Sequence, residues 1–535
     1  MSRGLGGVEV NKIIRSRFSG NPDPDLRELL RGPLLPDYGV LKRAALNAWG
    51  SFSAIVDLDD GEILILTDAG GSVPVFYARA KDAVVAGFQA ETVASESDNT
   101  SLDLVSAADF VINERVCFPF SIFKGVFQAS PGSLTRIDAL RISEEAYYLP
   151  EECDSGGSVD DWGARLREIT RRTLDVGLAG ATTCTVLFSG GEDARAVAMN
   201  LPARVDPELA IFTDGDNRET ALAQRAADAM GLKLRRILRP PGYYRDEIQQ
   251  RADMIGYGVD VRHTHAHGPV AESLAGVDAL CGGYKADSLF KTCWMENVGR
   301  AVGGLGTQFI YKDRPNLAPK HGASEPSWLV QWLSEAVDGR RTEHERRLKE
   351  FRPSSARNWS HLWPMSQGFT YGHYLSCLQI GPKIVEPFLG PQAYRYAAEL
   401  PDRFRLEREA FRRAFYSTKG RASWIPTSSG KIPALGNGVG RVVELGIWGS
   451  WQVRRKGSRV LSRIRGERPG SEGAWPSEHF GFAPPREWMQ GERFDELCRA
   501  MIRHSDIRQG DPLDRVLNNE QRLRLVQLTM SPAKL

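Results

Sequence analysis

Residues 184–195 read Cys-Thr-Val-Leu-Phe-Ser-Gly-Gly-Glu-Asp-Ala-Arg, a run whose character changes twice. The apolar residues end at Ser189, two glycines follow, and a helix-compatible stretch begins at Arg195. This order predicts a buried parallel strand, a glycine turn and the start of a helix. The backbone N–H groups of such a turn, together with the helix dipole, bind phosphate groups. Ser189 adds a hydroxyl donor, and Asp193 supplies a carboxylate suited to a magnesium ion that bridges phosphates.

The composition is that of a globular protein with about two to four domains. Of 535 residues, 41% are hydrophobic and 25% are charged, and the formal net charge of +2 gives no electrostatic ground for nucleic-acid binding. The sequence shows no apolar run of membrane-spanning length, and residues 1–20 lack a signal-peptide core. The seven cysteines are scattered and include no Cys-x-x-Cys pair, which favours reduced thiols over a zinc site or disulfides. We therefore expect a cytoplasmic protein without nucleic-acid or membrane partners.

The texture of the sequence changes near residue 160. Residues 38–148 contain short β-rich runs separated by turns, and residues 150–161 are acidic and rich in Gly and Ser, as in a linker. From residue 161, helical stretches alternate with apolar strands, which predicts a doubly wound parallel sheet that binds ligands at the carboxyl ends of its strands. Beyond residue 325 the pattern is mostly helical. The expected strands are 52–58, 62–67, 73–78, 83–86, 133–137, 184–188, 209–212, 234–238 and 277–281, and the expected helices are 162–178, 219–230 and one that begins at 195.

Three short motifs stand in order in the N-terminal third. Residues 68–77 (Asp-Ala-Gly-Gly-Ser-Val-Pro-Val-Phe-Tyr) match the pattern D-x-x-G-x-x-P-L-Y, and residues 123–134 match F-K-G-I followed by P-P-G-H. Residues 49–52 (Trp-Gly-Ser-Phe) form the third motif, which matches the pattern Asn-Gly-x-Phe except at Trp49. In order and spacing, these motifs resemble the class II glutamine amidotransferase domain of the asparagine synthetase family. The resemblance implies an α+β sandwich of the N-terminal nucleophile (Ntn) type over residues 1–150.

The glutaminase residues of that family are missing from this sequence. The family's nucleophile is a cysteine at the processed N-terminus, whereas this chain begins Met1-Ser2-Arg3 and its first cysteine is Cys117. Trp49 replaces the Asn that donates to the oxyanion. Without a thiolate and that donor, glutamine hydrolysis has no chemistry. We expect a degenerate glutaminase domain, with nitrogen supplied by ammonia or an amine, as in the β-lactam synthetase and lasso-peptide cyclase branches.

The C-terminal part resembles the synthetase domain of the same family. Residues 189–193 resemble its pyrophosphate loop, SGGxDS, with Ala194 in place of the last Ser. Residues 212–215 (Phe-Thr-Asp-Gly) end the next strand, where the family's backbone contacts adenine, and residues 280–290 resemble L-S-G-E-G-S-D-E-x-F, with Gly and Asp at 283 and 287. The resemblance implies an α/β domain like the adenine nucleotide α-hydrolases over residues 160–440, with ATP and Mg²⁺ as cofactors. The implied nucleotide-binding residues are Leu187, Phe188, Ser189, Gly190, Gly191, Asp193, Phe212, Asp214, Gly282 and Gly283, and the implied metal ligands are Asp193 and Asp287.

Two further segments bear on the amine and on the adenylate. Residues 386–390 (Glu-Pro-Phe-Leu-Gly) resemble the family's V-P-F-L-D, and Lys383 stands where the family has a Glu. Glu386 is therefore the candidate that binds or deprotonates the amine, with Tyr371 and Tyr374 nearby as packing aromatics or site residues. Lys431 stands where the family places a lysine that stabilises the adenylate, and a plain surface lysine is the alternative. The implied catalytic residues are Lys431, Glu386, Asp193 and Asp287.

Several other features leave alternatives open. His263, His265 and His267 would share one face of a strand and could bind metal, contact substrate or serve structure alone. Lys285 replaces a family glycine and is either a phosphate contact or a surface residue. Residues 441–485 form a basic, Gly/Pro-rich linker that is either solvated or in contact with an acidic partner or peptide, and residues 486–535 are expected to form a helical tail.

The resemblance implies an ATP-dependent ligase that forms amides. A small-molecule or peptide carboxylate would attack the α-phosphate of ATP, and ammonia or an amine would then displace AMP from the acyl-adenylate. Alternatives are a lasso-peptide macrolactam cyclase, a glutamine-dependent asparagine synthase and a catalytically inactive nucleotide-binding relative. A peptide or homodimer partner stays open. The family positions that differ in this chain, and that favour the inactive relative, are Ala194, Ser288, Lys383 and Gly390.

Overall fold

A computed structural model describes most of the chain. The described residues are 13–14, 19–20, 24–31, 37–57, 63–81, 84–137, 141–153, 156–291, 295–297, 317–319, 328–365, 369–378, 380–405, 408–417, 420–435, 483–503, 513 and 516–535, with short pieces between 442 and 457. The chain start at Met1-Ser2-Arg3 and nearly all of the expected linker 441–485 lie outside the described residues.

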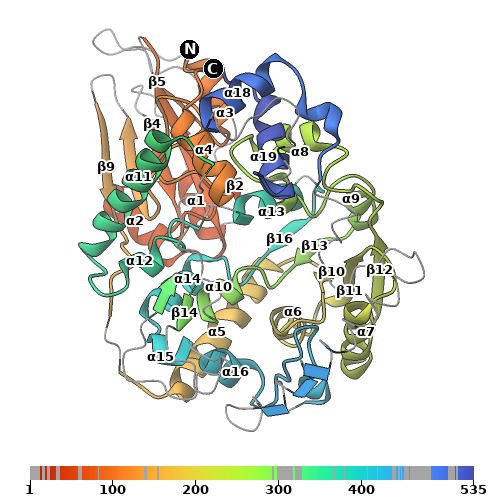
Figure 1. Cartoon of the computed structure of the whole chain (residues 1–535). Helices are drawn as coiled ribbons and strands as arrows, with labels where there is room; N and C mark the ends of the chain where they lie inside the picture. Colours follow the sequence, from red (N-terminus) through yellow and green to blue (C-terminus); the bar gives the residue numbers. More distant parts are fainter. Residues whose placement is uncertain are drawn as a thin grey trace.

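Two sheets form the N-terminal part (Figure 1). One has the order β2-β3-β4-β8-β9 with antiparallel pairs throughout, and the other has the order β1-β6-β5-β7, in which β1 pairs parallel with β6. The strands of the first sheet are β2 (Ser19–Gly20), β3 (Phe52–Asp57), β4 (Ile63–Thr67), β8 (Ser133–Ile137) and β9 (Ile142–Ala146). Those of the second are β1 (Ile13–Ile14), β5 (Phe76–Arg79), β6 (Val84–Gly87) and β7 (Val126–Gln128).

Alternating side chains of β3 divide between two separate cores. Phe52, Ala54 and Val56 pack with helices α1 (Pro24–Arg31) and α2 (Tyr38–Asn47), whereas Ile55 belongs to a cluster between the two sheets. Helices α3 (Ala90–Glu96) and α4 (Leu104–Asn113) belong to the core beyond the second sheet. The expected α+β sandwich is confirmed. Helices α2, α3 and α4 lie within residues 38–148, so this region is rich in sheet but not all-β.

A parallel sheet of five strands forms the second part, in the order β12-β11-β10-β13-β16. The strands are β10 (Thr183–Leu187), β11 (Asp206–Thr213), β12 (Leu234–Leu238), β13 (Ala279–Cys281) and β16 (Lys383–Val385). From the central β10 the chain runs through β11 to β12 on one side, and β13 and β16 then lie on the other side. The carboxyl ends of β10 and β13 therefore flank a topological switch point, the place where such sheets bind ligands.

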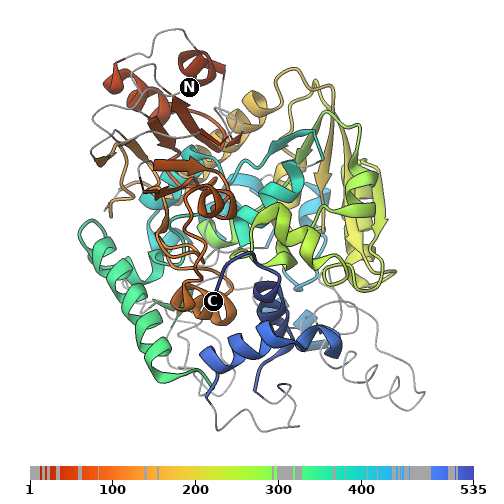
Figure 2. The same ribbon diagram turned by 90° about the horizontal axis from the view of Figure 1, so that it is seen from above.

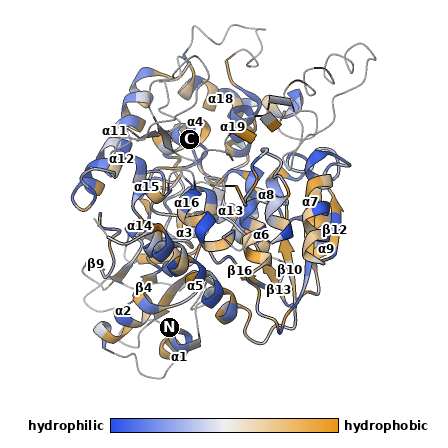
Figure 3. Ribbon diagram, turned by 90° about the horizontal axis from the view of Figure 1, so that it is seen from below, coloured by the Kyte–Doolittle hydropathy of each residue, from blue (hydrophilic) through white to orange (hydrophobic). Residues whose placement is uncertain are grey.

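Helices accompany the parallel strands, whose ribbons are mostly apolar in colour (Figure 3). They are α5 (Val159–Gly177), α6 (Glu192–Ala198), α7 (Arg218–Met230), α8 (Ile248–Ile255), α9 (Gly268–Leu274) and α10 (Ala286–Phe290). Capping boxes at Ser158 and Asn217 begin α5 and α7. The helix expected from Arg195 begins three residues earlier, because Gly191 takes the N-cap position. The expected doubly wound parallel sheet is confirmed.

The remainder of the chain is mostly helical, as expected. Its elements are α11 (Gln331–Lys349), α12 (Ala356–Trp359), α13 (Phe369–Leu378), α14 (Pro391–Glu399), α15 (Asp402–Arg405), α16 (Glu409–Phe415), α18 (Glu492–Met501), α19 (Asn519–Thr529), the 3₁₀ turns η3 (Arg421–Trp424) and η4 (Arg486–Met489), and the strand pair β14 (Met295–Asn297) and β15 (Leu317–Pro319). Helix α19 packs against α4 and α8, so the C-terminal segment bridges both parts (Figures 1 and 2). None of the helices described is both long and apolar enough to cross a bilayer.

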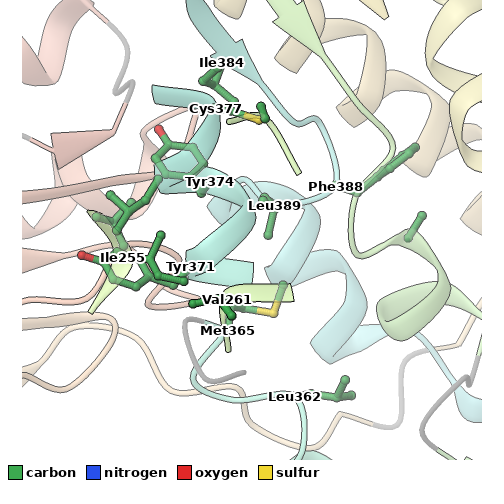
Figure 4. Packing of buried hydrophobic residues seen from close by; sticks show 14 of the residues in the cluster. Ile255, Val261, Leu362, Met365, Tyr371, Tyr374, Cys377, Ile384, Phe388 and Leu389 are labelled. Carbon is green, nitrogen blue, oxygen red and sulfur yellow. The ribbon is translucent and has the colours of Figure 1, made fainter. Parts of the chain in front are cut away.

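Helix α13 lies where the two parts meet. Tyr371 donates a hydrogen bond from its hydroxyl to the Phe88 carbonyl of the N-terminal part, at 2.6 Å. Tyr374, one turn along, packs near Cys377 and Ile384 (Figure 4). One apolar cluster runs from the N-terminal sheets through α13 into the parallel sheet. The domain boundaries at 150–160, 440 and 485 stay predictions.

Candidate functional site

A cavity of about 300 Å³ lies at the carboxyl ends of β10, β11 and β13. Its volume falls in the range of small-molecule sites. Eight of the ten expected nucleotide-binding residues line it, namely Leu187, Phe188, Ser189, Gly191, Asp193, Phe212, Gly282 and Gly283. Glu386 lines it as well, together with residues that the sequence did not single out for this site, which are Ala194, Ala210, Ile211, Arg239, Tyr244, Tyr284 and His373.

The two glycine turns touch one another. Gly190 has φ +73°, and a Cβ there would lie 2.8 Å from the Ala223 Cα in α7. A Cβ on Gly283 would lie 2.7 Å from the backbone carbon of Asp193. Because β10 and β13 are neighbours in register, the turns that follow them meet, and only glycine allows so close an approach. The structure thus brings the Ser189–Gly191 turn and the Gly282–Gly283 turn together.

Asp193 lies in the first turn of α6 and forms an ion pair with Lys291. Burial raises the pKa of the Asp193 carboxyl to about 6, with Lys291 opposing the rise and Asp287 adding to it. The carboxylates of Asp193 and Asp287 therefore lie near enough to repel one another. Asp287 itself does not line the cavity; it accepts a hydrogen bond from the Ser288 N–H at 2.8 Å.

Glu192 carries the second acidic group at the start of α6. Burial alone would raise the pKa of its carboxyl, but Arg408, Lys291 and Lys431 reverse this and lower it to about 2. Arg408 Nη1 lies 2.5 Å from Glu192 Oε1. Lys431 is exposed and does not line the cavity, although its positive charge helps to lower the pKa of Glu192. Its expected catalytic role stays a prediction.

Asp214, at the end of β11, does not line the cavity either. It forms a buried ion pair with Arg239, with Nε and Oδ1 2.9 Å apart. Arg239 does line the cavity, and its Nη1 donates to the Tyr244 hydroxyl at 3.1 Å. The Asp214 carboxylate therefore holds Arg239 in the cavity wall, and the expected nucleotide contact of Asp214 stays a prediction.

His373 of α13 forms a buried pair with Glu386, with Nε2 and Oε1 2.9 Å apart. The Tyr284 ring stacks on the imidazole at 4.1 Å between centroids, and the Tyr284 N–H donates to Glu386 Oε2 at 3.0 Å. Burial would lower the pKa of His373, but Cys377 and Glu386 raise it to about 10. The raised pKa favours the imidazolium form of His373 in the cavity wall.

The expectation that three alternating histidines share one face of a strand is wrong. His263 ends a 3₁₀ turn, η1 (Val261–His263), and His267 takes the N-cap position of α9. Only His265 of these three lines the cavity, where its Nδ1 lies 2.9 Å from the Tyr244 hydroxyl. His267 instead forms a hydrogen bond with Glu247, with Nε2 and Oε2 2.8 Å apart.

His263 belongs to an acidic cluster with Glu114 and Asp260, whose potential ligand atoms lie within 4.8 Å of one another. Arg262 and Arg524 already form ion pairs with both carboxylates of the cluster. We therefore interpret it as an ion-pair network that joins η1 to α4 and α19.

The structure also shows the surroundings of Trp49 and Cys117, the two residues considered above for glutamine hydrolysis. The guanidinium of Arg172 in α5 lies 4.8 Å from the centroid of the Trp49 ring. Burial raises the pKa of the Cys117 thiol to about 12, so Cys117 is no nucleophile at neutral pH. Lys285 is buried and has φ +69°, which rules out the surface alternative, and the phosphate contact stays a prediction.

Comparison with known proteins adds little to this geometry. No known family profile matches the chain, and no curated protein matches it. A solved structure described as the allosteric regulatory enzyme of purine biosynthesis is weakly similar, with a TM-score of 0.17 and 12% sequence identity. The match covers 36% of this chain and 38% of that one, so this chain spans well under half of that protein. A superposition this poor supports no statement about function.

Proposed function

We propose that this protein is an ATP-dependent ligase that adenylates a carboxylate and transfers the acyl group to ammonia or an amine. One observation carries the proposal: two glycine turns meet at the switch point of a parallel sheet, around a cavity bordered by Asp193. Ligands of such sheets bind at this point. The motif resemblance to the asparagine synthetase family supplies the reaction.

The cavity wall suits a nucleoside triphosphate. The Ser189–Gly191 turn offers backbone N–H groups and a hydroxyl for phosphate oxygens. Leu187, Ile211 and Phe212 offer apolar surface on the side of β10 and β11. A base placed there would lie between the strand ends, with its phosphates toward α6.

The acidic groups fit a divalent cation. Asp193 and Asp287 would hold Mg²⁺, because carboxylate oxygens are its preferred protein ligands and the charge of Asp287 adds to the rise in the pKa of Asp193. When bound, Mg²⁺ would neutralise charge on pyrophosphate. The Lys291 ammonium compensates part of the negative charge of Asp193.

Glu386 is placed for the second half-reaction. A Cβ on Gly282 would lie 2.3 Å from Glu386 Oε1, so the carboxylate lies directly against the second glycine turn. His373 and the Tyr284 N–H fix its orientation. A carboxylate held there can accept a proton from the attacking amine.

A second candidate function is nucleotide binding without catalysis. The ion pair between Lys291 and Asp193 favours it, because it occupies a carboxylate that the ligase needs for the metal.

Exchange of labelled pyrophosphate into ATP, measured with a library of carboxylic acids, separates the two functions. The ligase predicts exchange that depends on one class of acid and is lost in Asp193→Asn, whereas a binding protein binds ATP and shows no exchange with any acid.

A further inference from the structure

A second cavity, of about 280 Å³, lies on the other side of Glu386. It runs beside the edge strand β16, between the end of α5 and the segment Trp49–Ser51 of the N-terminal part. Glu386 lines both cavities, so one buried carboxylate separates them. The second cavity therefore reaches the acyl-transfer position without passing through the nucleotide cavity.

The wall of this second cavity holds a polar group that lacks a partner. The Tyr374 side chain is only 2% exposed, and its hydroxyl has no hydrogen-bond partner within the described part of the chain. Buried hydroxyls without a partner are rare, because they lose their hydrogen bonds to water and gain none. Tyr374 lines the cavity, so a ligand there can supply the missing bond.

The charged side chains of the cavity wall are ordered, with the cationic ones toward the exposed side and the acidic one at the buried end. Arg27 and Lys383 line the cavity, and Lys383 Nζ donates to the Ala179 carbonyl at 2.6 Å on the exposed side. Among the described residues that line it, Glu386 is the single acidic one, and it lies at the buried end. A ligand that carries a negative group at one end and an amine at the other matches this order.

We propose that the second cavity binds the amine substrate, and that this substrate is a small anionic amine of the amino-acid class. Its anionic group lies near Arg27 and Lys383, and its nitrogen lies at Glu386. The direction of transfer rests on the proposed ligase function. In that step the new C–N bond forms, the acyl C–O bond to AMP breaks with its electron pair on AMP, and a proton passes from nitrogen to Glu386.

The replacement at Trp49 fits this assignment. Its indole forms part of the cavity wall and is held by Arg172. Free ammonia would not need cationic side chains in the cavity wall. The experiment must therefore distinguish ammonia from an amino acid as the nitrogen source.

Isothermal titration of the full chain with single amino acids, their methyl esters and methylammonium tests the proposal. We expect at least one amino acid to bind, with its ester and methylammonium at least about tenfold weaker, because they lack the charge that Lys383 and Arg27 meet. Lys383→Gln and Tyr374→Phe should each weaken the binding by about tenfold. Lys233→Gln, at an exposed lysine that lines neither cavity, should leave it unchanged.

The outcomes separate this proposal from the ligase function. Failure of every amino acid to bind, or unchanged affinity in both cavity variants, overturns it. Binding as expected with no acid-dependent pyrophosphate exchange keeps the cavity site and overturns the ligase. Exchange together with amide formation from ammonium alone keeps the ligase and overturns the amino-acid site. ATP affinity, read in parallel, should be the same in Tyr374→Phe and wild type.

Discussion

The ammonium of Lys291 forms an ion pair with the carboxylate of Asp193, the acidic residue of the Ser-Gly-Gly-Glu-Asp turn. The same ammonium lies 3.7 Å from Glu192 Oε2. A metal that binds Asp193 must therefore displace this contact or share the carboxylate with it. In the proposed ligase, the charge state of Asp193 would therefore control metal and nucleotide binding.

Mg²⁺·ATP binding should strengthen as pH rises through about 6. Only the deprotonated carboxylate ligates a metal, and the pKa of Asp193 is raised to about 6, so the competent form appears above that pH. Titration calorimetry at several pH values between about 5 and 8 measures the pH midpoint of this binding. In Lys291→Met the midpoint should move upward, because the opposing cation is gone. An unchanged midpoint in that variant contradicts the role given to the ion pair.

Glu192→Gln should destabilise the protein at neutral pH. The folded-state pKa of Glu192 is lowered to about 2, so its stabilising effect is full above the unfolded value near 4.5 and is lost as pH falls toward 2. The shift corresponds to at most about 3 kcal/mol. Urea unfolding at neutral pH measures it. Glu208→Gln, which removes an exposed ion pair with Arg235, is the control and should change the free energy of unfolding by less than about 1 kcal/mol. Equal losses in both variants would refute the assignment.

Gly190→Ala should impair ATP binding far more than Gly180→Ala. Both glycines have positive φ, +73° and +76°, so each substitution costs about 1–2 kcal/mol of backbone strain. Only at Gly190 would the new Cβ collide with backbone, that of α7, whereas nothing lies within 4 Å at Gly180. Thermal unfolding and ATP titration of the two variants separate strain from collision. Similar behaviour of the pair would show that the turn tolerates a side chain.

Glu386→Gln should slow amide formation and spare adenylation. In the proposed reaction the carboxylate serves the amine step, and loss of a general base costs about 10²–10⁴-fold in rate. His373→Gln should give a smaller loss, because the imidazole only positions Glu386. Pyrophosphate exchange and amide yield, measured on the same preparations, report the two steps. A parallel fall in both rates would place Glu386 in the nucleotide site instead.

The sequence predicted the scaffold well where apolar periodicity was strong. The strands at 133–137 and 234–238 have the expected bounds, and the turn after β10 joins the turn after β13 as parallel neighbours must. The strand considered for residues 263–267 did not form, and alternating polar residues carry no signal for burial. Asp260 instead caps a 3₁₀ turn there.

The partners of the acidic residues were not predictable from local pattern. Arg408 lies 216 residues from Glu192 in sequence, and His373 is one buried residue of a helix without an active-site motif. Such pairs are set by how α13 packs beside β16 and how α16 packs on α5. Tyr374 was considered for the site, but its position in the wall of the second cavity depends on the N-terminal part packing beside β16.

A crystal structure with Mg²⁺ and α,β-methylene-ATP, which cannot be cleaved at the bond that adenylation breaks, addresses the nucleotide site itself. We predict phosphates on the Ser189–Gly191 backbone, a cation between Asp193 and Asp287, and Lys291 moved away from Asp193. A nucleotide bound elsewhere, or an Asp193–Lys291 pair that stays intact beside phosphates without a cation, would contradict the ligase proposal.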